Sequence, residues 1–292
     1  MYAKCADIGN ALKVSIEFPN QTQVSWNSII AALCMFEEWV ASLDAFRIMQ
    51  EEGFGASSFT LVSVSLAGSG VEKYSGLRLV KELHGMAFGG TILCWETYTY
   101  NSLIALYAKL GSVCDSVSLF DRFVYGDIVT WNTMVSSLAQ KERYVEAVDV
   151  VRRMVVARFK PDGVTLSSVL PACSQIEMLD FGKAIHAFSI RNDGLCENSF
   201  VGSALVDMYC RFGEILKARI VFDGVSEPRL GLWNAMISGY AQNEFDEEAL
   251  ELFIAMEEAA GFCPNAATLA RVLPSCVRSQ RFSCRKASMD MW

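Results

Sequence analysis

The fold is decided by one stretch, Val129-Thr130-Trp131-Asn132-Thr133-Met134-Val135, which has two near-copies elsewhere in the chain. The copies are Val24-Ser25-Trp26-Asn27-Ser28-Ile29-Ile30 and Leu232-Trp233-Asn234-Ala235-Met236-Ile237. The Trp-Asn pair therefore returns after 105 residues (131 − 26) and again after 102 (233 − 131). An apolar phrase that returns at a nearly fixed, long interval is typical of a repeat array.

Each copy begins an amphipathic helix. In the middle copy the apolar residues Trp131, Met134, Val135 and Leu138 fall at i, i+3, i+4 and i+7, which is one face of an α-helix. A second amphipathic helix follows a short polar break, and it ends at Lys160-Pro161-Asp162 because proline cannot continue a helix. The repeating unit is therefore predicted to be a hairpin of two antiparallel helices.

Two further types of hairpin lie between the Trp-Asn units. One begins Val164-Thr165-Leu166-Ser167-Ser168-Val169-Leu170-Pro171, and the other begins Phe200-Val201-Gly202-Ser203-Ala204-Leu205. Hairpins of this size cannot bury their apolar faces alone. The predicted fold is therefore all-α, a right-handed α-solenoid (superhelix) of stacked antiparallel helix-turn-helix repeats. The predicted units, with a partial unit at each end, are 1–22, 23–57, 58–96, 97–127, 128–162, 163–198, 199–229, 230–265 and 266–292.

Composition narrows the classes of function. Hydrophobic residues make up 52% of the chain, which excludes a disordered protein, and Asp, Glu, Lys or Gly interrupts every apolar run before it reaches membrane-spanning length. The first residues resemble neither a signal peptide nor an organellar transit peptide. The net charge of −8 has the wrong sign for a nucleic-acid binder taken as a whole, because phosphate contacts need positive potential. The acidic clusters are interpreted as solvated helix faces.

No residue pattern predicts catalysis, a metal site or a cofactor. The ten cysteines form no Cys-x-x-Cys pair, and His84 and His186 are the only histidines, so a zinc site is not expected. The cysteines are interpreted as small packing residues kept reduced. A phosphate loop and a catalytic triad are both missing from the sequence, which predicts that the protein is not an enzyme.

These motifs resemble the pentatricopeptide repeat family, in particular the plant subclass whose arrays cycle through P, L and S motifs. Val24-Ser25-Trp26-Asn27 resembles the start and Lys160-Pro161-Asp162 the end of a P motif. The stretch from Thr165 to Cys173 resembles an L motif, and the stretch from Phe200 to Tyr209 an S motif. The resemblance covers the chain to about Phe282. A tetratricopeptide solenoid, the main rival, has its own signature and a near-constant repeat length, and the alternation of 31- and 35-residue units in this chain argues against it.

The resemblance implies sequence-specific binding of single-stranded RNA in mitochondria or chloroplasts, with one repeat for each base. It implies that the fifth residue of the first helix and the last residue of the repeat reach the base edge together, and that the second residue sandwiches the base. This is chemically reasonable, because an unpaired base offers its Watson–Crick edge and two stacking faces. Asparagine carries both a donor and an acceptor, so it can distinguish one edge from another.

The residues that the resemblance assigns to base reading form pairs. They are Asn27 with Ser57, Asn101 with Asp127, Asn132 with Asp162, Ser203 with Arg229, and Asn234 with Asn265. The L units would supply the weaker readers Val62 with Glu96 and Ser167 with Asn198. The base-sandwiching residues would be Val24, Tyr98, Val129, Val164 and Phe200, together with Phe59, whereas Gly231 leaves its repeat without a wedge.

In the family, Asn with Asp resembles a uridine reader, Asn with Ser a cytidine reader and Asn with Asn a pyrimidine reader. The predicted target, read 5′ to 3′ along the chain, is therefore C, any base, U, U, any base, any base and a pyrimidine. Ser203 with Arg229 departs from the family pattern, so its base is left unassigned.

Other interpretations of the same residues stay open. Asn27, Asn132 and Asn234 lie near helix starts, where asparagine is a good N-cap. Trp26, Trp131 and Trp233 share the phase of the apolar face, which favours a core position over base stacking. His84 and His186 occupy equivalent places and are interpreted as packing or hydrogen-bonded residues. Arg152, Arg153 and Lys81 are candidates for phosphate contact, but they are interpreted as part of a solvated face.

Three functions are compatible with the sequence. The first is an RNA-binding adaptor for editing, splicing or processing of organellar transcripts, with a deaminase-domain protein or other editing factor acting in trans. The second is a protein-interaction solenoid, which the acidic net charge favours. The third is a truncated, non-functional fragment, because both ends cut through a repeat and carry no polar cap.

Overall fold

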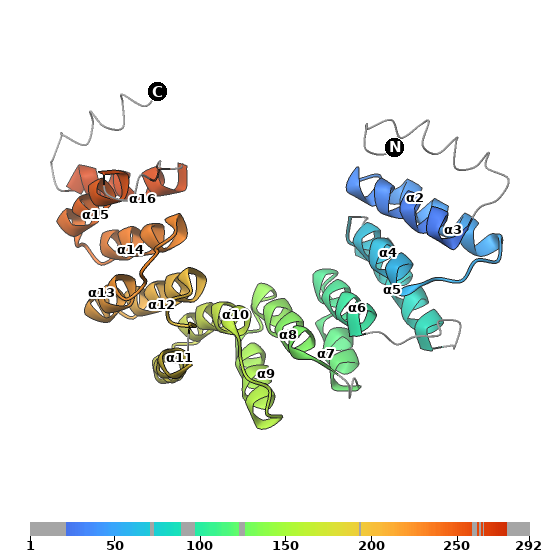
Figure 1. Ribbon diagram of the computed structural model, residues 1–292, viewed down its shortest axis with the longest axis horizontal. Coiled ribbons are helices and arrows are strands. Elements are labelled where there is room, and N and C mark those ends of the chain that lie inside the picture. The colour runs from blue at the N-terminus through green and yellow to red at the C-terminus, as the bar shows by residue number, and fades with distance from the viewer. Residues whose placement is uncertain are drawn as a thin grey trace. The chain divides into compact units, whose positions relative to one another are not determined.

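A computed structural model describes residues 22–70, 73–88, 97–122, 126–192, 194–258, 262, 264 and 266–278 (Figure 1). Within these ranges the ordered elements are α-helices, and no strand is found. The partial unit predicted for 1–22 lies outside the described residues except for Thr22.

The helices alternate between two sets along the chain. The even-numbered helices are α2 (Gln23–Met35), α4 (Ser58–Gly70), α6 (Thr97–Lys109), α8 (Ile128–Gln140), α10 (Gly163–Gln175), α12 (Ser199–Arg211), α14 (Leu230–Gln242) and α16 (Ala266–Arg278). The odd-numbered helices are α3 (Trp39–Glu51), α5 (Lys73–Phe88), α7 (Val113–Arg122), α9 (Tyr144–Val156), α11 (Leu179–Arg191), α13 (Ile215–Asp223) and α15 (Asp246–Glu258).

The chain divides into two compact units, Met1–Lys141 and Glu142–Trp292. In the first unit α2, α4, α6 and α8 pack side by side in chain order, and in the second α10, α12, α14 and α16 do the same. The odd-numbered helices α3, α5 and α7, like α11, α13 and α15, each pack against the even-numbered helices before and after them. This helix-on-helix stacking is an α-solenoid, as predicted.

The apolar face predicted for α8 forms part of the core. Met134, Val135 and Leu138 are at most 1% exposed. Trp131 is half-buried and meets Phe120 of α7 edge-on, with ring centroids 4.9 Å apart. Trp233 of α14 packs on Phe222 of α13 with the same separation. Edge-to-face packing of this kind stabilises a core, so the tryptophans hold helices together, as predicted.

Each described turn between paired helices contains one residue in the left-handed region. In four turns that residue is a glutamate, with φ between 55° and 66°: Glu37, Glu142, Glu177 and Glu244. Two turns use Gly111 and Gly213 instead. In the turns at Glu37, Gly111, Glu177, Gly213 and Glu244 the residue that follows donates its N–H back into the first helix, as from Met178 to the Cys173 carbonyl at 2.9 Å. This bond closes a Schellman turn, for which glycine is the preferred left-handed residue.

Close helix contact depends on two glycines in the second unit. A Cβ on Gly239 of α14 would lie 2.1 Å from the Cys210 sulfur of α12, and one on Gly182 of α11 would lie 2.1 Å from the Met208 sulfur. No side chain fits at such distances. Gly182 and Gly239 therefore determine how closely α11 and α14 pack against α12.

The cysteines only partly match the packing role predicted for them. Cys34, Cys173 and Cys210 are buried, and burial raises the pKa of the Cys173 thiol to about 11 and that of Cys210 to about 12. Cys114 is exposed, however, so it is not a packing residue. Across the part of the chain that the structure describes, no helix combines the length and apolar character needed to cross a membrane.

Candidate nucleic-acid interface

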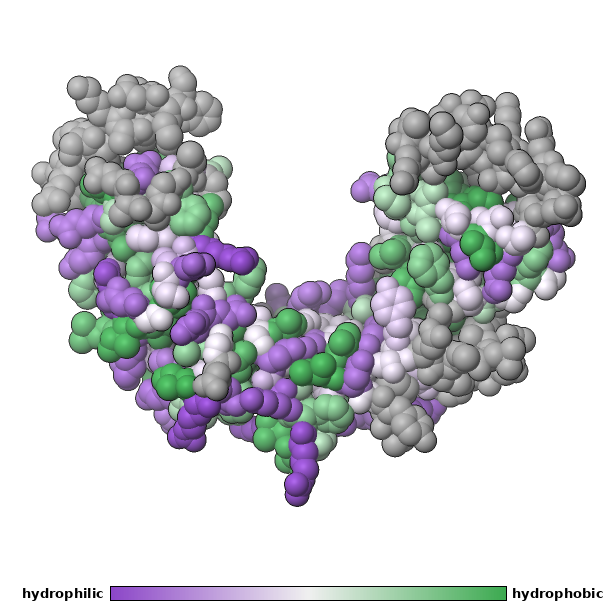
Figure 2. All heavy atoms as spheres, in the orientation of Figure 1, coloured by the Kyte–Doolittle hydropathy of each residue, from purple (hydrophilic) through white to green (hydrophobic). Residues whose placement is uncertain are grey.

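The second residue of each even-numbered helix from α2 to α12 is apolar and exposed. The exposed fractions range from 51% to 72%. These residues are Val24, Phe59, Tyr98, Val129, Val164 and Phe200. Single exposed apolar residues are ordinary, but the same exposure at the same helix position in six successive hairpins points to a common use. Figure 2 shows apolar residues as small groups among hydrophilic ones on the face in view.

The residue just before an even-numbered helix acts as its N-cap. Asp127 caps α8 and Asp162 caps α10, and each forms a capping box with the threonine three residues on. Asn198 caps α12 by accepting the N–H of Phe200 at 2.9 Å. Asp127, Asp162 and Asn198 are the last residues of their predicted repeats. Each therefore belongs to one repeat and caps the first helix of the next.

The N-capping role proposed for the asparagines is wrong. Thr22, Asp127 and Arg229 occupy the N-cap positions of α2, α8 and α14. Asn27, Asn132 and Asn234 lie at the fifth position, inside the helix. Near a helix start the sequence alone cannot separate the two places, because it does not fix the helix boundary to within a few residues.

The structure brings Asn27 and Ser57 together. The Asn27 side-chain amide donates to the Ser57 hydroxyl at 3.1 Å, and its carbonyl accepts from the Thr60 hydroxyl at 2.5 Å. The Ser57 and Thr60 hydroxyls are themselves 2.8 Å apart. The fifth residue of one hairpin and the cap of the next helix thus share a single hydrogen-bonded group, although they lie 30 residues apart in the sequence.

The equivalent residues around Asn101 are bonded differently. The Asn101 side chain is 7% exposed, and its carbonyl oxygen has no hydrogen-bond partner among the described residues. The Thr130 hydroxyl, the counterpart of Thr60, donates instead to the Asp127 carboxylate at 3.0 Å. A carboxylate only accepts, so it takes the one proton that the hydroxyl can give. Asn101 is therefore left with a buried acceptor.

Three predicted reading residues lie in other settings. Asn132 is 8% exposed on α8, and Asp162 holds the backbone N–H of Thr165 at 2.9 Å. The Asn234 carbonyl accepts from the Thr268 hydroxyl at 2.7 Å, which repeats the bond from Thr60 to Asn27. Asn265 and Glu96 lie outside the described residues.

Ser203 and Arg229 do not form such a group. The Ser203 hydroxyl donates to the Ser199 carbonyl one turn back at 2.7 Å. Arg229 makes no side-chain cap, and its guanidinium lies over the ring of Phe200, 5.4 Å from the ring centroid. The predicted pair is therefore replaced by contact between the cap residue and the exposed aromatic residue.

The sequence did not reveal the threonine whose hydroxyl donates either to the asparagine or to the cap. Thr60, Thr130, Thr165 and Thr268 occupy the third position of α4, α8, α10 and α16, and each is at most 1% exposed. A threonine at the same helix position in several repeats was the available signal. Its partner depends on whether the cap can donate, which only the structure reveals.

The sequence itself matches known repeat models. A model described as the PPR repeat family matches residues 126–175, and one described as the PPR repeat matches 24–54, 98–125 and 232–259. The chain carries PPR repeats. The pentatricopeptide repeat-containing protein At3g57430, chloroplastic, of Arabidopsis thaliana is 50% identical over 98% of this chain. The mitochondrial protein At2g03880 of the same species is 32% identical over 94% of it.

The chain spans about a third of the first of these relatives and 42% of the second. Among solved structures, PPR10 in complex with an 18-nt psaJ RNA element has a TM-score of 0.71 at 18% identity, covering 98% of this chain and 42% of that one. PPR10 from maize has a TM-score of 0.69 at 17% identity and covers 98% of this chain and 46% of that one. At these identities the likeness concerns the fold.

The two histidines of the PPR array form matching hydrogen bonds. The Nδ1 atoms of His84 and His186 lie 2.9 Å from the hydroxyls of Tyr107 and Tyr209, respectively. Burial lowers the pKa of both histidines. Each bond connects an odd-numbered helix to the even-numbered helix that follows it, which agrees with the predicted hydrogen-bonded role.

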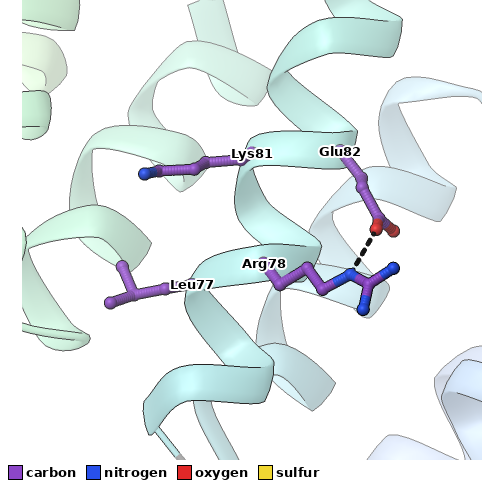
Figure 3. A pocket seen from close by; sticks show the side chains of 4 residues that line it. All are labelled: Leu77, Arg78, Lys81 and Glu82. Carbon is purple, nitrogen blue, oxygen red and sulfur yellow. Dashed lines mark hydrogen bonds and ion pairs between the residues drawn. The ribbon is translucent and has the colours of Figure 1, made fainter.

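The basic residues considered for phosphate contact are used in different ways. Leu77, Arg78, Lys81 and Glu82 of α5 line an open hollow, where Arg78 pairs with Glu82 at 3.1 Å (Figure 3). Arg152 lies over the ring of Phe181, 5.2 Å from its centroid. The described residues include no group of three His, Cys, Asp or Glu side chains placed to hold a metal ion.

Proposed function

We propose that this chain is an adaptor that binds single-stranded RNA and reads its bases one hairpin at a time. The observation that carries the proposal is an exposed apolar residue at the second position of each even-numbered helix from α2 to α12. The fifth residue of each of these helices is polar, except in α4, where it is Val62. An unpaired base needs a stacking surface and hydrogen-bonding groups for its edge, and this pattern supplies both.

The likeness to PPR10, which was crystallised with an RNA element, supports the proposal. The local geometry supports it as well, because Asn27 and Ser57 meet at one point although they come from opposite ends of a predicted repeat. Asn101 adds a buried carbonyl oxygen without a donor, and the N3–H of a uracil would supply one.

The proposal assigns the repeat boundaries and the site residues given by the sequence. Asn27 with Ser57 reads cytidine, and Asn101 with Asp127 and Asn132 with Asp162 read uridine. Asn234 with Asn265 reads a pyrimidine. The exposed residues that sandwich the bases are Val24, Phe59, Tyr98, Val129, Val164 and Phe200.

Gel-shift titration tests this assignment. An RNA carrying the series C-A-U-U-A-A-U is compared with a control in which the cytidine and uridines are replaced by purines. The target should bind more tightly, and its affinity should fall steeply as salt concentration rises, because phosphate contacts release counterions. Equal affinity for both RNAs would contradict the assignment.

We further propose that the protein acts on transcripts of a chloroplast or a mitochondrion, as a member of the subclass whose arrays cycle through P, L and S motifs. The names of its relatives, which are chloroplastic or mitochondrial, support the compartment. Editing is the transcript-processing step that we favour, with the deaminase supplied in trans. Loss of one organellar editing event in plants lacking the protein, restored by complementation, would test this.

The acidic net charge of −8 favours a second candidate, a solenoid that binds another protein. Binding of the target RNA that is weak and independent of salt concentration would favour this second function over the first.

A further inference from the structure

The contact between Arg229 and Phe200 sets one hairpin apart from the others. The other described cap residues on even-numbered helices from α4 to α12 are neutral or acidic, namely Ser57, Asp127, Asp162 and Asn198. Arg229 instead places a cation over the exposed ring of Phe200, 5.4 Å from its centroid. The Phe200 ring, on which a base would stack, is therefore covered by Arg229, the residue predicted to read that base together with Ser203.

The polar groups around this contact leave the guanidinium as the main group for a base edge. The Ser203 hydroxyl gives its proton to the Ser199 carbonyl at 2.7 Å, and the Ser199 hydroxyl accepts the Arg229 backbone N–H at 3.1 Å. Arg229 is exposed and its guanidinium carries only donors. A base edge with two adjacent acceptors is its natural partner.

The space for such a base is open on the side of the next helix. Gly231 holds the position where a sandwiching residue would stand, and even an added Cβ would come no closer than 3.8 Å to the nearest atom, the Ser203 hydroxyl. A base stacked on Phe200 would therefore meet no wedge from α14. The guanidinium can move off the ring and hold the edge of the base, because a base stacks on an aromatic ring more strongly than an exposed cation does.

We propose that the hairpin of α12 and α13 selects guanine, with Arg229 holding the O6 and N7 atoms while Phe200 stacks on the base. This inference rests on the proposed function and fills the sixth position of the series, which the family pattern leaves unassigned. Guanine presents two adjacent acceptors, O6 and N7, to the planar fork of arginine. Unpaired cytosine also presents two, O2 and N3, but its single ring offers less stacking surface to Phe200 than the purine does.

The experiment uses four RNAs of the series C-A-U-U-A-N-U that differ only in N, titrated against the 292-residue chain and its variants. The wild-type chain should bind the RNA with N = G at least about tenfold more tightly than the other three, which is the discrimination expected of one bidentate contact. Arg229→Ala should remove that preference. Arg229→Lys should also remove it, because lysine keeps the charge and loses the fork.

Arg211→Ala is the matched control, because Arg211 is an exposed cation in the last turn of α12, at the opposite end of the helix from Phe200. It should leave the preference for guanine intact. Circular dichroism of each variant shows whether the helices are retained.

Two outcomes would overturn the inference. If Arg229→Ala weakens all four RNAs equally and reduces the salt slope by about one, the guanidinium binds phosphate and reads no base. If the wild-type chain prefers C-A-U-U-A-N-U over a purine-substituted RNA but ignores N, the inference fails and the proposed function stands. Equal binding of the purine-substituted RNA refutes both.

Discussion

At the scale of single residues, the caps combine two positions in one side chain. Asp127 ends one predicted repeat and holds the backbone N–H of Thr130 at the start of α8, 2.9 Å away. A substitution at Asp127 changes the stability of α8, in addition to any effect that it has on ligand binding. Folding and recognition therefore have to be measured separately at these positions.

Asp127→Ala should lower the free energy of unfolding by about 1 kcal/mol, because alanine cannot accept the N–H of Thr130. Asp127→Asn should retain most of the stability, since the amide oxygen can still accept it. Urea denaturation followed by circular dichroism measures both variants. Equal destabilisation by the two substitutions would mean that the cap contributes through its charge.

Asn27→Ala should destabilise the chain more than Asn101→Ala. The Asn27 side chain is bonded at both ends, and each bond contributes about 0.5–1.5 kcal/mol net. The Asn101 carbonyl is buried without a donor, so its removal relieves a desolvation cost. Paired urea titrations of the two variants check the order, and the reverse order would show that a donor reaches Asn101.

At the scale of helices and turns, stability depends on contacts whose partners are far apart in the sequence. Gly239→Ala should cost about 1–3 kcal/mol, because the new Cβ would overlap the Cys210 sulfur. Cys210→Ala in the same chain should recover part of the loss by opening space. Gly85→Ala is the control, since nothing lies within 4 Å of its Cβ and alanine favours a helix.

The left-handed glutamates offer a stabilising change. Glu177 has φ of 55°, a conformation that costs an L-residue about 1 kcal/mol and glycine almost nothing. Glu177→Gly should therefore raise the melting temperature, and Gly213→Ala, at φ of 71°, should lower it. Differential scanning calorimetry of both variants tests the pair. Lower stability of Glu177→Gly would show that the glutamate side chain contributes more than its strained backbone costs.

The sequence predicts helices well and side-chain partners poorly. The helical face of Met134, Val135 and Leu138 is visible as a period, and it is buried as predicted. The contact between the Arg229 guanidinium and Phe200 cannot be predicted in this way, because a cation–π contact between residues 29 apart has no periodic signature in the sequence. For a similar reason the sequence leaves Asn27 with two possible roles, an N-cap or a base reader. Its distance from the N-cap depends on the helix boundary, which the sequence does not fix.

At the scale of the whole molecule, the only two histidines in the chain are divided between its two compact units, and each bonds to a tyrosine. Their pKa values are lowered by burial, so the folded chain keeps them neutral at a pH where the unfolded chain has bound protons. The unfolded state then binds more protons, and stability rises with pH. The stability that depends on the two histidines staying neutral is fully present above the unfolded pKa of 6.5, and it is lost as the pH falls below that value.

Stability measured by urea denaturation should therefore decrease as the pH falls below 6.5. The double variant His84→Gln, His186→Gln should reduce this dependence, because glutamine can bond to the tyrosine hydroxyls without titrating. Each single variant should remove part of the effect. An unchanged pH profile in the double variant would assign the dependence to the carboxylates.

The position of the caps has a consequence for how such an array changes over generations. Serine, asparagine and aspartate cap a helix about equally well, so exchanges among them leave the next hairpin folded. Under the proposed function these same exchanges alter the preferred base. The array can thus drift from one target to another by single substitutions that selection on folding does not oppose. Arg229 is the exception, because this N-cap residue makes no side-chain cap and carries a positive charge instead.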